Sequence, residues 1–554
     1  MRPLARRLLI LLPLVVATTP AAADASKQTV CTITVNSADE REAFRRSLPA
    51  ERFEFVELVE RGRPDWLASA CRKGVRCDVL LISGHFDDGS EFYSDRLDSH
   101  DRLPVAEMER AACTEGCSGL FSRLKEVYLF GCNTLSAGGL RFASGEAVRS
   151  LVRSGHSQAD AEALARILET RHGESNRDRM RVVFKDVPVI YGFSSKAPLG
   201  ARAAPLLERW FKSGGAADVA QGRGSARLLG LFAPVSMQAA TGVSNADAQA
   251  GHRQDVCRFV DDTGSVAQRV AFVHALLQRE PAEVQMYLDR LDLLTRSLAD
   301  AASDSAEAAL ARASLAADAA ARRRFLDVAR DADEFATAVR MFDVAQRVGW
   351  LSAADHRAEF IRLVAARARR GVTSAADVDT VCASNARHEL DQAAKVLPPR
   401  SAYADTAGNA AVLACLGRGE ARARALRALT ANDEAEAQVA QVYLRHRPVE
   451  EVAEIRDLTA AISGMTGGAA QVRALEALAA LRVSDRETLA TLTALYPRAR
   501  SLNVQRAIAG VLIRADYRAF AHPDLVRALR THRLASPDGE DLIDVLIRRL
   551  QTVS

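Results

Sequence analysis

Several features are scarce in this sequence of 554 residues, and their scarcity excludes whole classes of protein. Aromatic residues make up only 5% of the chain, as expected where much of it is Ala/Leu-rich helix. The formal net charge is only +4, and no basic patch interleaved with aromatic residues is found, so we expect no nucleic-acid partner. Beyond the first 23 residues, no apolar stretch is long enough to cross a bilayer, so we expect no stable membrane anchor.

The sequence also lacks a C-x-x-C motif, and no histidine stands at ligand spacing beside its first four cysteines. Without C-x-x-C, thiol–disulfide exchange is the weakest of the functions considered. Without nearby histidines, disulfides are favoured over a zinc site for those cysteines. We therefore expect neither a metal nor a cofactor.

The first 23 residues have the pattern of a secretory signal peptide. Arg2, Arg6 and Arg7 precede an apolar run over residues 8–16, and an Ala-Ala-Ala cleavage site ends at Ala23. The mature chain is expected to begin at Asp24 and to be soluble and exported. A bacterial periplasm is the expected destination, with secretion as the alternative.

Nine cysteines then have to be accommodated in an oxidising compartment. An odd number leaves at least one thiol unpaired, and such a thiol in an exported protein is a candidate reactive group. If Cys132 is the unpaired one, eight cysteines remain for up to four disulfides, whose connectivity the sequence leaves open. The spacing allows Cys71 to pair with Cys77, Cys113 with Cys117, and Cys382 with Cys415.

Apolar patterns divide the mature chain into an α/β part and an all-α part. Residues 24–213 alternate strand and helix patterns, which predicts a mostly parallel sheet covered by helices on both faces. The predicted strands are 29–35, 53–59, 77–83, 126–131 and 187–193, and residues 87–103 are predicted to form a loop or small hairpin. Residues 214–254 are rich in Gly, Ala, Ser and Gln and are predicted to be a linker containing one strand or short helix at 228–232.

Helical spacing dominates the rest of the chain, with an irregular region over residues 255–400 and a repetitive one over 401–554. Val439, Val472 and Val504 stand 33 and 32 residues apart, and each lies near the start of an Ala/Leu-rich helix. Periods of this size are typical of helical-hairpin solenoids. The Val-Arg-x-Leu-x-Ala-Leu pattern resembles HEAT-type repeats, which implies a concave surface for a protein partner.

Two predicted strands end in residues that can perform acyl-transfer chemistry. Leu80-Leu81-Ile82-Ser83-Gly84-His85 delivers a histidine, and Val127-Tyr128-Leu129-Phe130-Gly131-Cys132 delivers a cysteine. Side chains just past the carboxyl ends of parallel strands lie in the crevice where α/β sheets bind ligands. Cys132 follows His85 by 47 residues, which leaves room for one crossover connection. His85 is therefore predicted to be the base and Cys132 the nucleophile; the alternatives are a polar strand cap and a buried small hydrophobe.

An apolar strand ending in Gly-His, followed about fifty residues later by one ending in Cys, resembles the caspase-like cysteine peptidases. The nearest resemblance is to their bacterial branch with CHAT-type domains, over roughly residues 28–215. The sequence departs from that group at two places. Phe86 stands where the group usually has Gly, and the residues around Cys132 lack the Gln-Ala-Cys signature of true caspases. The resemblance implies a caspase-like α/β domain that acts on a protein or peptide substrate.

Residues around the two strand ends are candidates for supporting roles. Backbone N–H groups of Cys132 and of the Gly84–His85 turn are the expected oxyanion donors, with Gly131 shaping the second turn. Three acidic residues after His85 are candidates to orient it or to receive a basic substrate side chain, the alternative being a solvated loop: Asp87, Asp88 and Asp95. The resemblance implies that the residues after the last strand form a wall of the substrate pocket, the alternative being an ordinary loop: Ser194, Ser195 and Lys196.

Three hypotheses of function follow from these patterns. The leading one is an exported caspase-like cysteine endopeptidase whose helical repeats bind partners or substrates. The second is a caspase-like fold without activity, in which the repeats mediate protein–protein interaction. The third and weakest is a redox role for the paired cysteines.

Overall fold

The chain folds into two compact units in a computed structural model. One unit comprises Met1–Ser144 with Ala163–Gly264, and the other comprises Gly145–Glu162 with Ser265–Ser554. The structure describes residues 27–63, 65–86, 90–94, 101–138, 148, 151–152, 157–172, 175–300, 305–466, 468–481, 483–515, 523–535 and 541–553. The predicted signal peptide and Asp87, Asp88 and Asp95 lie outside these residues.

The first unit contains a six-stranded sheet in the order β2-β1-β3-β6-β7-β8. The first five strands of this order run parallel, and β8 is antiparallel to β7. The strands of this sheet are β1 (Gln28–Thr34), β2 (Phe53–Glu57), β3 (Val79–Ser83), β6 (Glu126–Phe130), β7 (Val189–Phe193) and β8 (Met237–Ala240). A separate two-stranded sheet consists of β4 (Glu91–Tyr93) and β5 (Arg102–Pro104). Every residue of β3, β6 and β7 is buried, as their apolar runs predicted for strands covered on both faces.

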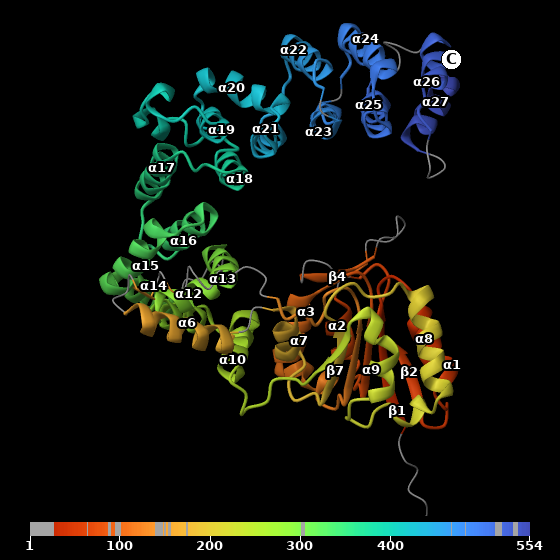
Figure 1. Ribbon diagram of the computed structural model, residues 1–554. Coiled ribbons are helices and arrows are strands. Elements are labelled where there is room, and N and C mark those ends of the chain that lie inside the picture. The colour runs from red at the N-terminus through yellow and green to blue at the C-terminus, as the bar shows by residue number, and fades with distance from the viewer. Residues whose placement is uncertain are drawn as a thin grey trace, which may run out of the picture. The chain divides into compact units, whose positions relative to one another are not determined.

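Helices cover both faces of this sheet (Figure 1). What we call the α1 face packs against α1 and α8 through residues such as Phe44 and Trp210, and the α3 face packs against α2, α3 and α7 through residues such as Leu67 and Met108. The helices of this unit are α1 (Asp39–Ser47), α2 (Trp66–Arg72), α3 (Val105–Cys113), η1 (Glu115–Cys117), α4 (Ser118–Phe121), α7 (Asn176–Val183), α8 (Gly200–Lys212), η2 (Gly215–Ala217), α9 (Ala226–Phe232), η3 (Ala233–Val235) and α10 (Ala250–Val260), while α6 (Gln158–His172) includes residues of both units.

The segment expected to be a linker, residues 214–254, folds as part of the first unit instead. Leu228 and Phe232 of α9 are fully buried in the core of the α1 face, and β8 forms the edge of the sheet. Small Gly, Ala and Ser side chains gave this segment the composition of a linker. The element predicted at 228–232 is present as the short helix α9, whereas the edge strand β8 has only one buried residue and was not indicated by periodicity.

The predicted small hairpin after His85 is present, since β4 pairs antiparallel with β5. Its two strands are separated by residues that the structure does not describe. Leu103 lies in β5, and α3 begins at Val105, directly after Pro104.

Four disulfides join eight of the nine cysteines, and Cys132 is the free one, as predicted. The pairs are Cys31–Cys77, Cys71–Cys117, Cys113–Cys257 and Cys382–Cys415, with Cα–Cα distances of 5.6, 4.9, 5.1 and 5.1 Å. Of the pairs that the spacing allowed, Cys382–Cys415 forms, whereas Cys71–Cys77 and Cys113–Cys117 do not. Partners come instead from elements brought together by the fold, such as β1 and the start of β3. Four disulfides fit a protein exported to an oxidising compartment.

All the regular secondary structure described in the second unit is helical. Its helices are α11 (Val266–Leu277), α12 (Pro281–Met286), α13 (Leu288–Asp300), α14 (Ala306–Ala317), α15 (Ala319–Asp331), α16 (Phe335–Arg347), α17 (Ala353–Arg370), α18 (Ala375–Ser384), η4 (Ala393–Val396), η5 (Arg400–Ala402), α19 (Ala407–Cys415), η6 (Gly419–Ala421), α20 (Arg422–Arg427), η7 (Ala428–Thr430), α21 (Glu434–His446), α22 (Val452–Ser463), α23 (Gly468–Ala479), α24 (Arg486–Leu495), η8 (Tyr496–Arg498), α25 (Leu502–Arg514), α26 (Pro523–Thr531) and α27 (Leu542–Val553). Within the described part of the chain, none of the helices has the length and apolar character needed to cross a membrane.

The C-terminal helices stack in two layers, which Figure 1 shows at the blue end of the chain. In one layer α21, α23, α25 and α27 pack successively on one another, and α22 packs on α24 in the other. Helices α21, α23 and α25 begin 34 residues apart, at Glu434, Gly468 and Leu502. The periodicity seen in the sequence therefore corresponds to a stack of helix pairs.

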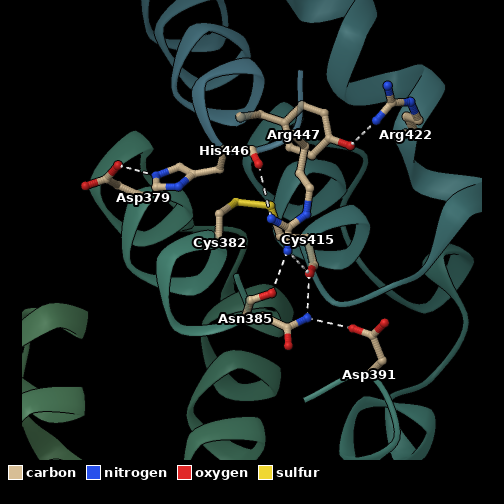
Figure 2. Close-up of a disulfide and its surroundings, with 9 residues drawn as sticks. Asp379, Cys382, Asn385, Asp391, Cys415, Arg422, His446 and Arg447 are labelled. Carbon is tan, nitrogen blue, oxygen red and sulfur yellow. Dashed lines mark hydrogen bonds and ion pairs between the residues drawn. A yellow bond between two sulfur atoms is a disulfide. The ribbon is translucent and has the colours of Figure 1, made fainter. Parts of the chain in front are cut away.

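Buried polar groups join neighbouring helices near the disulfide of this unit, which connects α18 to α19 (Figure 2). Arg447, just after α21, donates hydrogen bonds to the carbonyl oxygens of Asn385 and Cys415 at 2.6 and 3.4 Å. The side-chain amide of Asn385 also donates to the Cys415 carbonyl, at 2.8 Å. One arginine thus caps the carboxyl ends of two helices that the disulfide already joins.

Candidate functional site

His85 lies one residue beyond Gly84 at the carboxyl end of β3. Its backbone pairs with Tyr93 of the small hairpin through two hydrogen bonds, from His85 N to Tyr93 O at 3.0 Å and from Tyr93 N to His85 O at 2.9 Å. The two rings lie 5.4 Å apart between centroids, and the residue is partly exposed although its Nε2 atom is buried. The hairpin therefore holds the histidine in place from one side.

Cys132 occupies the equivalent position at the end of β6, one residue beyond Gly131. It is partly exposed and belongs to no disulfide. The next residue, Asn133, has a φ of 59°, so the chain turns sharply after the cysteine. The turn is fixed by the end of β7, because Asn133 N donates to Ser195 O at 2.8 Å and Leu135 N donates to Phe193 O at 2.9 Å.

The register of the sheet brings His85 and Cys132 to the same level. Strands β3 and β6 are parallel neighbours in which Ser83 pairs with Phe130. The Gly84 N–H continues the ladder by donating to Phe130 O at 3.1 Å. His85 and Cys132 each follow this pair by two residues, so the register brings both to the same edge of the sheet, just beyond the ends of adjacent strands.

The two glycines decide which face of the sheet His85 and Cys132 occupy. A Cβ on Gly84 would lie 3.1 Å from Val35 Cβ, and one on Gly131 would lie 2.8 Å from Phe86 Cβ. Val35 and Phe86 both belong to the core of the α3 face. Because successive side chains of a strand alternate between faces, His85 and Cys132 are directed to the opposite α1 face.

The side chains of His85 and Cys132 are not hydrogen-bonded to each other, since the bonds among the described residues include none between them. Proton transfer requires hydrogen-bond reach, and such contacts are often long until substrate is bound. The arrangement supplies an imidazole and a thiol on one face, at one level, of neighbouring strands.

The predicted oxyanion donors divide into one group that is available and two that are not. Gly84 N is bonded to Phe130 O, and His85 N is bonded to Tyr93 O, so the Gly84–His85 turn has no N–H left to donate; this part of the prediction was wrong. The Cys132 N–H, in contrast, donates to no acceptor among the described residues. The ladder between β3 and β6 opens at Cys132, which leaves this N–H for a ligand.

Phe86, the residue that differs from the caspase-like pattern, is fully buried and does not obstruct the turn. Its ring packs against Phe92 with centroids 4.6 Å apart. Phe86 also occupies the space where a Gly131 side chain would lie. A phenylalanine after the histidine is accommodated because the residue before the cysteine is glycine.

The residues after β7 lie beside the cysteine loop, although two of their hydroxyls are already hydrogen-bonded. Ser195 accepts through its carbonyl from Asn133 N, next to Cys132. The Ser194 hydroxyl donates to the Ser236 carbonyl oxygen at 3.4 Å, and the Ser195 hydroxyl is hydrogen-bonded to the Ser236 hydroxyl at 2.6 Å. Lys196 is exposed. The structure thus brings the backbone of this segment to the cysteine.

A buried carboxyl group at this edge of the sheet was not predicted. Glu40, in the first turn of α1, is 2% exposed and accepts a hydrogen bond from Ser83 Oγ at 2.9 Å. Burial raises the pKa of Glu40 from 4.5 to about 7, although hydrogen bonds from its own backbone N–H and from Ser83 oppose the shift, and Asp39 adds to it. The signal was present in the sequence, because Glu40 shares a helical face with Ala43 and Phe44, both fully buried.

No cluster of three or more His, Cys, Asp and Glu side chains among the described residues is arranged to hold a metal ion. Comparisons with protein-family models, with curated proteins and with solved structures find no match to this chain.

Proposed function

We propose that this chain is an exported cysteine endopeptidase of caspase-like type in which His85 is the general base and Cys132 the nucleophile. The observation that supports the proposal is the register of β3 with β6, which brings the ends of two adjacent parallel strands, and with them His85 and Cys132, to the same edge of the sheet. Cys132 is also the single cysteine outside the disulfides and is partly exposed. A reactive thiol in an oxidising compartment has to be spared from pairing in this way.

The proposed reaction begins when His85 accepts the proton from Cys132 Sγ and the thiolate attacks the carbonyl carbon of a peptide bond. The carbonyl oxygen becomes an oxyanion, which the Cys132 N–H can stabilise. The C–N bond then breaks, His85 returns the proton to the leaving amine, and a thioester remains on Cys132. Water hydrolyses the thioester, with His85 accepting a proton, to release the acid and restore the thiol.

The stacked helix pairs of the second unit are proposed to bind a partner or the substrate, as solenoids do. A bacterial periplasm is the proposed location, with secretion as the alternative. Amino-terminal sequencing of exported material would test this, with Asp24 as the expected first residue.

The decisive experiment is labelling with a panel of peptidyl electrophiles that differ at the residue before the scissile bond. Wild-type protein is expected to react with at least one member at Cys132, identified by mass mapping, and Cys132→Ala is expected to react with none. His85→Ala should label at least a hundredfold more slowly, since base catalysis contributes roughly that much. Labelling that is unchanged by His85→Ala would contradict the dyad.

The second candidate is a scaffold without peptidase activity, in which the helical unit mediates protein–protein interaction. The specific observation in its favour is that Nε2 of His85 is buried, which restricts the access of a substrate to this nitrogen. If no peptidyl electrophile labels Cys132 although iodoacetamide does, the thiol is accessible but not catalytic, and the scaffold function is the better one.

A further inference from the structure

Beneath the strand end that carries His85, the structure contains a buried acid that the proposed reaction does not use. Glu40 and Ser83 are both 2% exposed, and the Ser83 hydroxyl donates to Glu40 Oε2 at 2.9 Å. A buried carboxyl group is costly unless it is hydrogen-bonded, so its presence at this position requires an explanation. Salt bridges do not supply one, because none of the ion pairs among the described residues includes Glu40.

Ser83 is the residue through which Glu40 can act on the site. Ser83 lies two positions before His85, so the two side chains are on the same α1 face of the sheet. Its carbonyl oxygen accepts hydrogen bonds from Val35 N at 2.9 Å and Asn36 N at 3.3 Å, where the chain leaves β1. Ser83 thus ties together the exit of β1, the start of α1 and the end of β3.

We propose that Glu40 is a positioning residue, which fixes the end of β3, and with it His85, through its hydrogen bond to Ser83. The inference rests on the proposed function, because it assigns Glu40 a role in that same site. An ionised carboxylate accepts a stronger hydrogen bond from a hydroxyl than a neutral acid does. The hydrogen bond from Ser83 to Glu40 therefore becomes stronger as Glu40 loses its proton, near neutral pH.

The other charged groups near Glu40 are its neighbours in sequence or are paired with partners of their own. Asp39 precedes it at the start of α1 and lies against Gly200, the first residue of α8. Arg41 is paired with Glu42 and with Glu57 of β2, at 3.0 and 2.8 Å. Farther along the two helices, Arg46 of α1 pairs with Glu208 of α8 at 2.8 Å. On β3, the titratable group on this face is His85 itself.

The test measures the rate at which iodoacetamide alkylates Cys132 in the full-length protein, as a function of pH, in four variants. Glu40→Ala and Ser83→Ala remove the hydrogen bond and should slow alkylation about tenfold at every pH, as misplaced catalytic groups do. Glu40→Gln keeps an acceptor for Ser83 but cannot ionise. It should restore the wild-type rate at pH 6 and lack the inflection that the wild type shows near pH 7.

Glu42→Gln is the matched control, because it removes an acid from the same helix that is paired with Arg41 instead of Ser83. Its profile should match the wild type. If Glu40→Ala, Ser83→Ala and Glu40→Gln also follow the wild-type profile, Glu40 is not a positioning residue. Iodoacetamide reacts with the Cys132 thiolate, which His85 promotes, and needs no peptide-binding pocket. A protein that fails to label with peptidyl electrophiles therefore loses the proposed function, while this measurement still decides the role of Glu40. Circular dichroism of each variant excludes unfolding as the cause of a lower rate.

Discussion

Gly131 shows how the absence of a side chain determines the direction of a neighbouring one. The hydrogen in place of its side chain faces the core of the α3 face, where a Cβ would lie 2.8 Å from Phe86 Cβ and 3.0 Å from both Phe92 Cε1 and Gly84 O. A Cβ this close cannot be accepted without movement of the backbone or of two packed rings. The glycine therefore allows β6 to approach β3 closely, right up to the residue that carries the thiol.

Gly131→Ala should consequently destabilise the first unit by about 1–3 kcal/mol, the usual cost of overpacking a core. Gly230→Ala is the control, because a Cβ at this position of α9 would meet nothing within 4 Å. Alanine in a helix should there raise the unfolding free energy by about 0.5–1 kcal/mol. Urea denaturation of both variants measures the two effects, and equal stabilities would contradict the packing argument.

His85 and Cys132 themselves should contribute little to stability, since both are partly exposed beyond strand ends. His85→Ala and Cys132→Ala are each expected to change the unfolding free energy by less than about 1 kcal/mol, in contrast to buried side chains. For peptide hydrolysis the double variant should be no slower than either single one, because the two residues act as a unit. Additive losses of activity would show that they act independently.

Glu40 gives stability a pH dependence whose sign follows from its raised pKa. The folded protein holds this proton up to about pH 7, whereas a free carboxyl group loses it near 4.5. The stabilisation that the protonated group contributes to the folded state is therefore fully present below pH 4.5. As the pH rises through 7, the free energy of unfolding falls by roughly 3 kcal/mol in all. Glu40→Gln should remove that part of the loss, which chemical denaturation at pH 5 and pH 8 would measure. An identical loss in wild type and variant would contradict the assignment.

At the scale of elements, the sequence predicted the central strands best, because their apolar runs are the direct consequence of burial on both faces. Strands β3, β6 and β7 were predicted within two residues at each end, and the approach of His85 to Cys132 follows from them. Edge strand β8 was missed because only one of its residues is buried. Glu40 was missed because an acid in the first turn of a helix is ordinarily explained by the helix dipole.

In the helical unit, Arg447 links two helices, because it donates hydrogen bonds to carbonyl groups at the carboxyl ends of α18 and α19 from outside both. Arg447→Ala should lower the unfolding free energy by about 1–3 kcal/mol, because two hydrogen bonds from a charged donor are lost, although the Cys415 and Asn385 carbonyls each keep another donor. Arg445→Ala is the matched control on the preceding turn, because Arg445 is 66% exposed and forms only a 3.8 Å ion pair with Asp379. It should change stability by less than about 0.5 kcal/mol. Denaturation monitored by circular dichroism would compare them.

At the scale of the whole molecule, the disulfides are distributed by unit. Three of them join elements of the α/β unit, one joins two helices of the helical unit, and none crosses between the units. The pair with the longest span, Cys113–Cys257, connects α3 to α10 across 144 residues. Such connectivity could not be derived from the sequence, because pairing depends on which elements become neighbours. Cys132 could be identified as the free thiol only through its place at a strand end.

The connectivity yields a prediction that covers every cysteine at once. Alkylation of the non-reduced protein with iodoacetamide should modify Cys132 alone, because the other eight thiols are paired. A proteolytic digest without reduction should then contain Cys113 linked to Cys257 and Cys71 linked to Cys117, as mass spectrometry would detect. A Cys113–Cys117 link would instead detach α10 from α3. Cys132 in a disulfide would contradict the free thiol on which the proposed nucleophile depends.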